Sequence, residues 1–451
     1  MKYGNLLLAI CFLTGSFSLY SCKKYLDAKP DKKFAVPSDL ADYQSLLDYY
    51  TKLNDNGVAA PNMSSDNLYI TKTEWETIDD ETSRKIYLWQ RDNVFTPGFN
   101  YWNDIYISVY YANTAITNVP QINRKKDNAQ AWDNCMGEGL FFRANAFLQI
   151  ASTWCLAYDK HTANEDLGIP LRLNTDFNEP SKRSTLQQSY EQIIKDLKQS
   201  INLLPIAQAG PVRPNKAAAY GLLARTYLYM QDYQNAYFYA DSSLQLNSDL
   251  MNYNDLDPSA YYAIPEFNKE VQFADRCTDL GSVYGNVDST LYRSYDNNDL
   301  RKSLYFKPHG DGTQGYYGSY DGAPYSFIGV ATDEEYLIKA ECEARMNKVD
   351  EAMKDLNSLL VTRWKTGTFV PISAINQNDA LHKIINERRK ELLFRCLRWM
   401  DIKRLNKEGW NITLKRIFDG VIYTLPPNDP RYALPIPDDI IQISGMQQNP
   451  G

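Results

Sequence analysis

The stretch NKAAAYGLLARTYLYMQDYQNAYFYA, residues 215–240, decides the fold, because small residues recur in it at helical spacing on two consecutive segments. Ala224 lies in the first segment and Ala236 in the second. Small side chains at fixed helical offsets let two helix backbones approach closely. Asn215 follows a proline and has the side chain of an N-cap. The stretch therefore predicts two packed helices joined by a turn at 231–233.

The same pattern returns twice elsewhere in the chain. The matching positions are Tyr220 with Tyr336, Ala224 with Ala340, and Ala236 with Ala352. A third first-helix lies at 140–147, and its second helix is displaced to 189–204. This spacing fits the tetratricopeptide template, in which each helix pair packs on its neighbours to bury a shared core. We therefore expect a mainly α-helical scaffold of tetratricopeptide-like pairs.

Two segments interrupt the helical pattern. Residues 60–104 are polar and aromatic with weak periodicity, and residues 250–330 hold most of the Gly-containing turn signals. Long loops inside a compact domain are usually functional or disordered, and the aromatic density disfavours disorder. We therefore predict one domain over 38–451, with loop insertions in these two segments and a loop-rich, irregular second half.

Residues 381–405, LHKIINERRKELLFRCLRWMDIKRL, predict one long helix. Its arginines raise two possibilities, phosphate binding or a structural ion-pair network. Glu387 and Glu391 lie among the arginines at one-turn spacing, which favours the ion-pair network.

The N-terminus predicts export and a lipid anchor. Residues 6–13, LLLAICFL, follow a lysine and are too short to span a bilayer, so residues 1–21 are predicted to be a signal peptide. LYSC at 19–22 then resembles a bacterial lipobox, in which the cysteine thiol is acylated and the chain is cut before it. We expect lipidation at Cys22 and a tether over 22–37. The alternative is an ordinary cleaved signal followed by a disulfide cysteine.

The remaining cysteines and the overall charge exclude several classes of protein. Five cysteines are left after residues 11 and 22, an odd and scattered set without a CxxC motif, which disfavours a disulfide framework. The 48 basic and 55 acidic residues give a net charge of −7, which disfavours a nucleic-acid binder.

No pattern in the sequence predicts catalysis, a metal site or a cofactor. The three histidines share no ligand spacing, and no GxSxG, HExxH or Walker motif occurs. Asp79, Asp80 and Glu81 could in principle serve a glycosidase, but adjacent carboxylates rarely face each other across a bond. We expect a solvated acidic turn there and no enzyme.

Aromatic clusters in the two loop segments are the candidate ligand-binding residues. Ring faces suit the C–H faces of sugars or apolar peptide side chains, while hydroxyls can bond polar edges. The alternative is a loop packed onto the helices by its own rings. The candidates are Trp75, Trp89, Tyr292, Tyr295, Tyr316, Tyr317, Tyr320 and Tyr325.

Taken in order, several stretches resemble the SusD/RagB family of outer-membrane nutrient-binding lipoproteins. They are LYSCKKYLDAKP, YWNDIYISVYYANTAI, GLFFRANAFLQIAS, SYEQIIKDLKQSINLLP, NKAAAYGLLARTYLYMQDYQNA, DEEYLIKAECEARMNKVDEAMKDLN, INERRKELLFRCLRWMDIKR and YALPIPDDIIQISGMQQNPG. The resemblance implies four tetratricopeptide-like pairs, display at the outer membrane, and a SusC-like TonB-dependent barrel as partner. It also implies binding of oligosaccharides, or of peptides in some members, without catalysis.

The chain departs from the family at 394–397, FRCL, where an acidic residue and a glycine are more usual. The family's sugar contacts lie in variable loops, so none of them transfers to this chain by motif. We expect a surface lipoprotein that delivers a glycan to a transporter. The alternatives are the same role with peptides, or a tetratricopeptide adaptor that binds only proteins.

Overall fold

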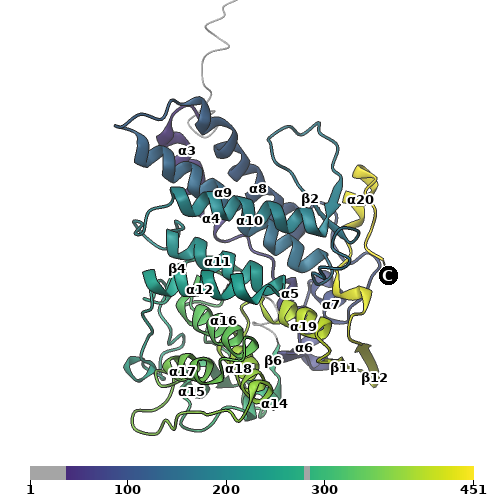
Figure 1. Ribbon diagram of the computed structural model, residues 1–451. Helices are drawn as coiled ribbons and strands as arrows, with labels where there is room; N and C mark the ends of the chain where they lie inside the picture. The colour runs from purple at the N-terminus through teal and green to yellow at the C-terminus, as the bar shows by residue number, and fades with distance from the viewer. Residues whose placement is uncertain (1–36, 279–284, 451) are drawn as a thin grey trace, which may run out of the picture.

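The computed structural model of the chain describes residues 37–278 and 285–450 (Figure 1). The predicted signal peptide, Cys22 and all but the last residue of the tether lie outside the described residues. The helices are α3 (Leu40–Leu47), α4 (Tyr50–Leu53), α5 (Ala60–Ser64), α6 (Lys72–Thr77), α7 (Glu81–Tyr87), α8 (Tyr101–Asn118), α9 (Ala129–Trp154), α10 (Leu186–Leu203), α11 (Lys216–Tyr229), α12 (Tyr233–Leu246), α14 (Ser289–Arg293), α15 (Arg301–Tyr305), α16 (Thr332–Arg345), α17 (Val349–Leu360), α18 (Gln377–Glu391), α19 (Arg398–Lys407) and α20 (Asp438–Ser444). Within the same ranges, no helix combines the length and apolar character needed to cross a membrane.

The strands are short and pair antiparallel in twos. The pairs are β1 (Leu68–Tyr69) with β6 (Asn286–Val287), β2 (Leu167–Pro170) with β3 (Arg183–Thr185), β4 (Val271–Phe273) with β10 (Val330–Ala331), β5 (Arg276–Cys277) with β9 (Ser326–Phe327), β7 (Phe306–Pro308) with β8 (Gln314–Tyr316), and β11 (Leu414–Phe418) with β12 (Val421–Leu425). Several of these pairs lie between α12 and α16, in the predicted irregular segment.

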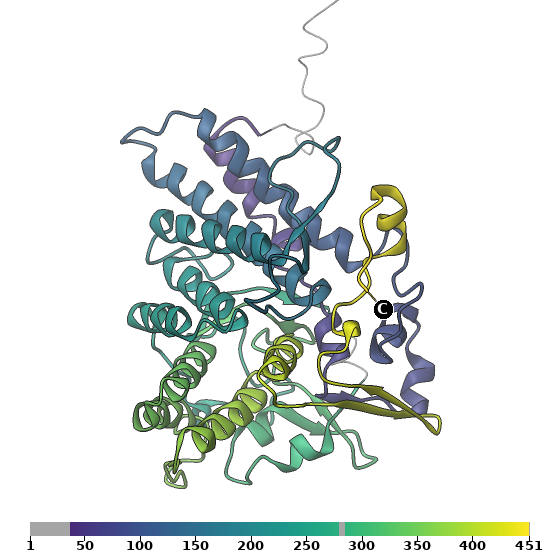
Figure 2. The ribbon, with the colours of Figure 1, turned by 45° about the vertical axis from the view of Figure 1, so that its right-hand side comes forward.

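Helix pairs build the scaffold in the order that the sequence predicts. α9 packs on α10, α11 on α12 and α16 on α17, and the pairs stack down one side of the molecule (Figures 1 and 2). The turns pass through Gln231 and Asn347, at φ +61° and +60°. Asn215 caps α11, because its side chain accepts the Ala218 amide N–H at 2.9 Å. The prediction of a mainly helical, helix-pair scaffold is confirmed.

The predicted single helix over 381–405 is wrong, because a corner over 392–397 separates α18 from α19. Phe394 and Cys396 adopt left-handed backbone conformations there, at φ +57° and +59°. Asn62 holds the corner: its side chain donates to the Phe394 carbonyl at 2.9 Å and accepts the Cys396 amide N–H at 2.8 Å. The corner turns Arg395 onto Asp333, with N–O distances of 2.7 and 3.0 Å. This is the stretch in which the sequence departs from the family pattern.

The arginines around this corner form a buried ion-pair network, as predicted. Arg388 pairs with Asp401 at 2.9 Å, and Arg404 pairs with Glu341 at 2.5 Å. Although burial alone would raise it, the charges of Arg404 and Arg345 hold the pKa of Glu341 at about 2. The network fixes the packing of α16, α18 and α19 and leaves these guanidinium groups unavailable to a phosphate.

Gly329 allows the irregular segment to approach the scaffold. A Cβ at this position would lie 1.9 Å from the Phe273 carbonyl oxygen. We expect Gly329→Ala to lower the free energy of unfolding by about 1–3 kcal/mol, because backbone must shift to make room. Gly210→Ala is the matched control, since nothing lies within 4 Å of its Cβ position. Urea denaturation of both variants measures the effect, and equal stability of the two would contradict the packing argument.

Asp275 makes stability depend on pH. Its carboxylate is buried between β5 and α9, where the side-chain amides of Asn145 and Gln149 donate to it at 2.8 and 3.1 Å. Burial raises the pKa of Asp275 to about 7, although these donors oppose the rise. Between about pH 4 and 7 the unfolded chain loses this proton while the folded chain keeps it, so stability falls as pH rises through that window.

Asp275→Asn removes this titration. We expect the variant to gain at least ~1 kcal/mol in unfolding free energy relative to the parent between pH 5 and pH 8. Urea midpoints at the two pH values measure the gain, with Asp127→Asn on the surface as control. A parent–variant difference that is the same at both pH values would refute the assignment.

Candidate ligand-binding clefts

Half of the predicted aromatic residues lie in the core. Trp89 donates its indole N–H to the Ser64 carbonyl at 2.9 Å, and Tyr295 donates to the Lys390 carbonyl at 2.8 Å. The Tyr320 hydroxyl lies 2.9 Å from Glu270, and Tyr316 packs on Phe394 with ring centroids 4.8 Å apart. The four predicted residues concerned are Trp89, Tyr295, Tyr316 and Tyr320, all buried. The polar groups of Trp89, Tyr295 and Tyr320 bond inside the fold, so a ligand reaches these three only if the core opens. Tyr316 is also mostly covered, but its residue borders the small cavity described below.

The other predicted rings are partly exposed. Trp75 lies between Tyr87 and Phe418, with centroid distances of 5.9 and 4.4 Å. Tyr292 packs edge-on against Phe306 at 5.4 Å. Each of these two candidates offers part of a ring to solvent, on separate elements.

Tyr317 and Tyr325 do meet in one small cavity of about 130 Å³. Tyr261 and Tyr262 also line it, with centroids 5.0 and 5.9 Å from that of Tyr317, and so does Tyr316. The Arg276 guanidinium lies 4.1 Å from the Tyr325 ring centroid. We call this cavity the tyrosine pocket. Its rings come from the segment in which the sequence predicted them.

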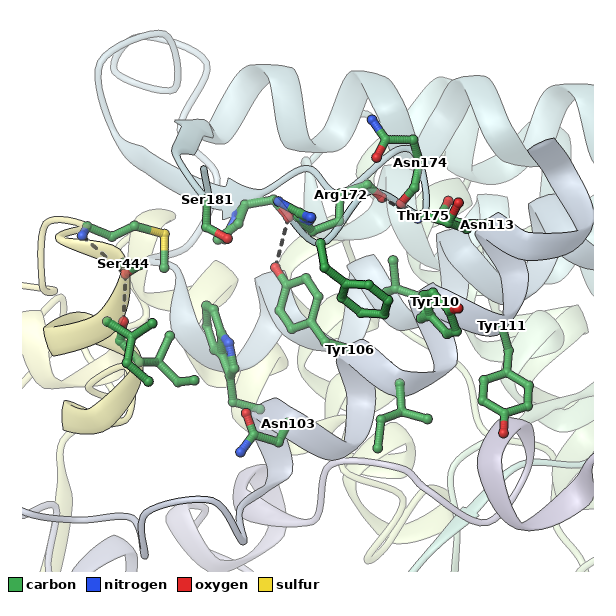
Figure 3. A pocket seen from close by; sticks show the side chains of 18 residues that line it. Asn103, Tyr106, Tyr110, Tyr111, Asn113, Arg172, Asn174, Thr175, Ser181 and Ser444 are labelled. Carbon is green, nitrogen blue, oxygen red and sulfur yellow. Dashed lines mark hydrogen bonds between the residues drawn. The ribbon is translucent and has the colours of Figure 1, made fainter. Parts of the chain in front are cut away.

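A larger cleft lies between α8, the loop over 171–182 that joins β2 to β3, and α20 (Figure 3). We call it the α8 cleft. Its volume is about 580 Å³, within the range of small-molecule sites in proteins. Its lining residues are Trp102, Asn103, Tyr106, Ile107, Val109, Tyr110, Tyr111, Asn113, Pro170, Arg172, Asn174, Thr175, Phe177, Ser181, Ile440, Ile443, Ser444 and Met446.

Aromatic rings line the floor of the α8 cleft as a ladder. Trp102, Tyr106 and Tyr110 are spaced four residues apart, so they lie on one face of α8, each about one helical turn from the next. Trp102 is buried and lies 5.0 Å from Tyr106, whereas Tyr110 is 38% exposed. Phe177, from the opposite loop, packs against Tyr110 at 4.9 Å and is 78% exposed. The ladder therefore runs from the protein interior to an open mouth.

Hydrogen bonds hold the loop over the cleft. The Tyr106 hydroxyl donates to the Pro170 carbonyl at 2.8 Å, and burial raises the pKa of this phenol well above its ordinary value. Asn113 donates to the carbonyls of Arg172 and Asn174 at 2.8 and 3.1 Å. The Arg172 guanidinium in turn bonds carbonyls within the same loop, including that of Glu179 at 2.5 Å. A loop fixed in this way lowers the ordering cost of binding.

The chemistry of both clefts is that of binding. Ring faces and the aliphatic side chains Ile440, Ile443 and Met446 supply apolar surface, and amide and hydroxyl groups supply polar contacts. In residues 37–278 and 285–450, no group of His, Cys, Asp and Glu is arranged to hold a metal ion. Asp80 of the acidic triplet caps α7 by accepting the amide N–H groups of Thr82 and Ser83.

The α8 cleft is not among the sites predicted from the sequence. Its floor is formed by α8, and its walls come from two distant segments, the 171–182 loop and α20. The available signal was the four-residue spacing of aromatic residues in α8 together with Phe177 in the loop over 171–182.

A stacked helix-pair scaffold that carries aromatic clefts is typical of a binding protein. Two family models cover most of the chain. Residues 24–228 match the model described as "Starch-binding associating with outer membrane", and residues 283–451 match the SusD family model. The chain belongs to the SusD/RagB family. Proteins of this family bind without catalysis, which confirms the prediction that the chain is not an enzyme.

Solved structures share the fold at low sequence identity. A SusD superfamily protein from Bacteroides thetaiotaomicron is 21% identical, with 92% of this chain and 100% of that chain covered and a TM-score of 0.73. One from Bacteroides vulgatus is 22% identical, with 93% and 99% covered and a TM-score of 0.73. A SusD-like carbohydrate binding protein from Bacteroides vulgatus is 18% identical, with 90% and 96% covered and a TM-score of 0.65. No curated protein matches the chain.

Proposed function

We propose that this protein is a lipid-anchored surface protein that captures a glycan and passes it to a SusC-like, TonB-dependent outer-membrane barrel. The observation that supports this proposal most strongly is the α8 cleft, an aromatic groove of about 580 Å³ in a member of a starch- and sugar-binding family. The tyrosine pocket is the second candidate surface, and its lining includes Tyr316, Tyr317 and Tyr325 from the sequence-based prediction.

The geometry of the α8 cleft suits a sugar chain. The C–H faces of sugar rings stack on aromatic faces, and the exposed pair Tyr110 and Phe177 offers such faces at the mouth. Asn103, Thr175 and Ser181 line the same cleft and can bond hydroxyl groups. A few stacked rings give modest affinity, which delivery to a transporter requires because the glycan must be released again.

Binding to a panel of polysaccharides tests the proposal. Affinity gels and titration calorimetry with soluble starch, xylan, mannan and pectin are expected to show saturable binding of at least one of them. Saturable binding of peptides, without binding of any glycan, would mean that the protein has the same role with a peptide as its ligand. Binding of neither, with capture of protein partners alone, would favour the adaptor hypothesis.

The anchor and the partner belong to the same proposal. Residues 1–21 act as signal peptide, Cys22 carries the lipid, and 22–37 tether the domain over 38–451. Mass spectrometry of the mature protein is expected to find an acylated Cys22 as the first residue. An unacylated mature N-terminus would remove the anchor. Copurification from membranes with a TonB-dependent barrel is the corresponding test of the partner.

A further inference from the structure

Two cysteines that are far apart in sequence meet in the fold. The sulfur of Cys277, on β5, lies 3.8 Å from that of Cys396, in the corner between α18 and α19. Cys277 is fully buried and Cys396 partly so. They share a small apolar cluster with Ala59 and Ile328. Among the described residues, no other two cysteine sulfur atoms lie within hydrogen-bonding distance of each other.

We infer that Cys277 and Cys396 form a disulfide bond in the exported protein. The inference rests on the export proposed above, because an oxidising compartment is where such a bond forms and persists. The odd number of cysteines disfavours a framework of several bridges, but it does not exclude one pair. Cys135, Cys155 and Cys342 are separately buried and would remain thiols.

The oxidant is a thiol–disulfide oxidoreductase with an active-site disulfide. Cys396 is the entry point, because its side chain lines a small surface depression beside Pro61 and Gln149. The Cys396 thiol loses its proton, and the resulting thiolate attacks the oxidant's disulfide to form a mixed disulfide while one oxidant sulfur leaves as thiolate. The Cys277 thiolate then attacks the Cys396 sulfur and releases the second oxidant sulfur. Two thiols are thus oxidised to one disulfide, and the oxidant becomes a dithiol.

The surrounding backbone brings the two sulfur atoms within reach. β5 is fixed by its pairing with β9, in which Cys277 faces Ser326, and by the Gly57 amide N–H, which donates to the Arg276 carbonyl at 3.2 Å. On the other side, Asn62 clamps the corner that carries Cys396. A disulfide has a sulfur–sulfur distance of about 2.05 Å, so the sulfur atoms must approach by less than about 2 Å.

The bond would join the irregular segment to the helical corner. It closes a covalent loop that runs from residue 277 to residue 396 and contains Tyr317 and Tyr325 of the tyrosine pocket. A cross-link over such a long loop stabilises the fold chiefly by restricting the unfolded chain. In the folded protein, the Cys277–Cys396 bond would also link the segment that carries the tyrosine pocket covalently to the helical scaffold.

Peptide mapping without reductant tests the inference on the full chain. The protein is recovered from cell envelopes in N-ethylmaleimide, denatured in its presence, digested and analysed by mass spectrometry. We expect a peptide pair linked through Cys277 and Cys396, with Cys135, Cys155 and Cys342 alkylated. In parallel, purified reduced protein is treated with oxidised glutathione and mapped in the same way.

The outcomes separate the bond from the proposed function. Alkylation of both Cys277 and Cys396 in both samples overturns the inference, as does linkage of either to another cysteine. A cross-link in the purified sample alone supports the pair and counts against export instead. Reductant is expected to lower the melting temperature of the oxidised protein by about 5 °C, and to leave that of the Cys277→Ala, Cys396→Ala variant unchanged. Glycan binding is measured separately and decides only the proposed function.

Discussion

Replacing Arg363 by alanine is expected to lower the free energy of unfolding by about 3–5 kcal/mol, because it removes the ion-pair partner of the buried Glu270 carboxylate and one of the two arginine partners of Glu391. Arg363 follows α17 and is fully buried. Its guanidinium bonds Glu391 of α18 at 2.7 Å and Glu270, just before β4, at 2.8 Å. It also donates to the Met251 carbonyl at 2.9 Å. One side chain thus connects the last helix pair to the irregular segment.

Arg124→Ala provides the matched control. Arg124 makes a comparably short ion pair with Asp133, at 2.7 Å, but its side chain is 50% exposed. Exposed pairs contribute about 0–1 kcal/mol, so this variant should unfold within that margin of the parent. Guanidinium denaturation followed by circular dichroism measures both variants. Similar losses in the two would mean that burial does not determine the contribution of Arg363.

The helix pairs could be predicted from the sequence because their signal is local. Ala224 and Ala236 lie in the two helices that they bring together, and Asn215 caps the helix that it precedes. The corner at 392–397 could not be predicted in this way. Asn62, which holds that corner open, lies in a different part of the chain, and only the fold brings it to Phe394 and Cys396.

The candidate site likewise combines features that the local sequence predicts with features that depend on the fold. A tyrosine in a glycine-rich loop looks the same in sequence whether its hydroxyl meets water or a buried carboxylate. Tyr320 meets Glu270 and Asp333 in the core, whereas Tyr317 borders the tyrosine pocket three residues away. The α8 cleft combines one helix with two segments remote from it, so its volume exists only after folding. Composition could predict that aromatic surfaces are present, but not which rings stay exposed.

Removing the two exposed rings of the α8 cleft is expected to abolish most glycan binding. Tyr110→Ala and Phe177→Ala should each weaken affinity by up to about tenfold, because a stacking contact contributes roughly 0.5–1.5 kcal/mol. The double variant should lose up to about 100-fold if the two contributions add. The probe is the polysaccharide that binds the parent most tightly in the panel, measured by titration calorimetry. Both side chains are exposed, so the melting temperature should stay unchanged.

Two controls separate the α8 cleft from other surfaces. Phe99→Ala removes a ring that is 87% exposed and outside the cleft lining, so affinity should be unchanged. Tyr317→Ala tests the tyrosine pocket in the same assay. Full binding by the Tyr110→Ala, Phe177→Ala variant together with loss of binding by Tyr317→Ala would move the glycan site to the tyrosine pocket. The two clefts are built from different elements. Comparing the Tyr110→Ala, Phe177→Ala variant with the Tyr317→Ala variant therefore shows which cleft binds the glycan.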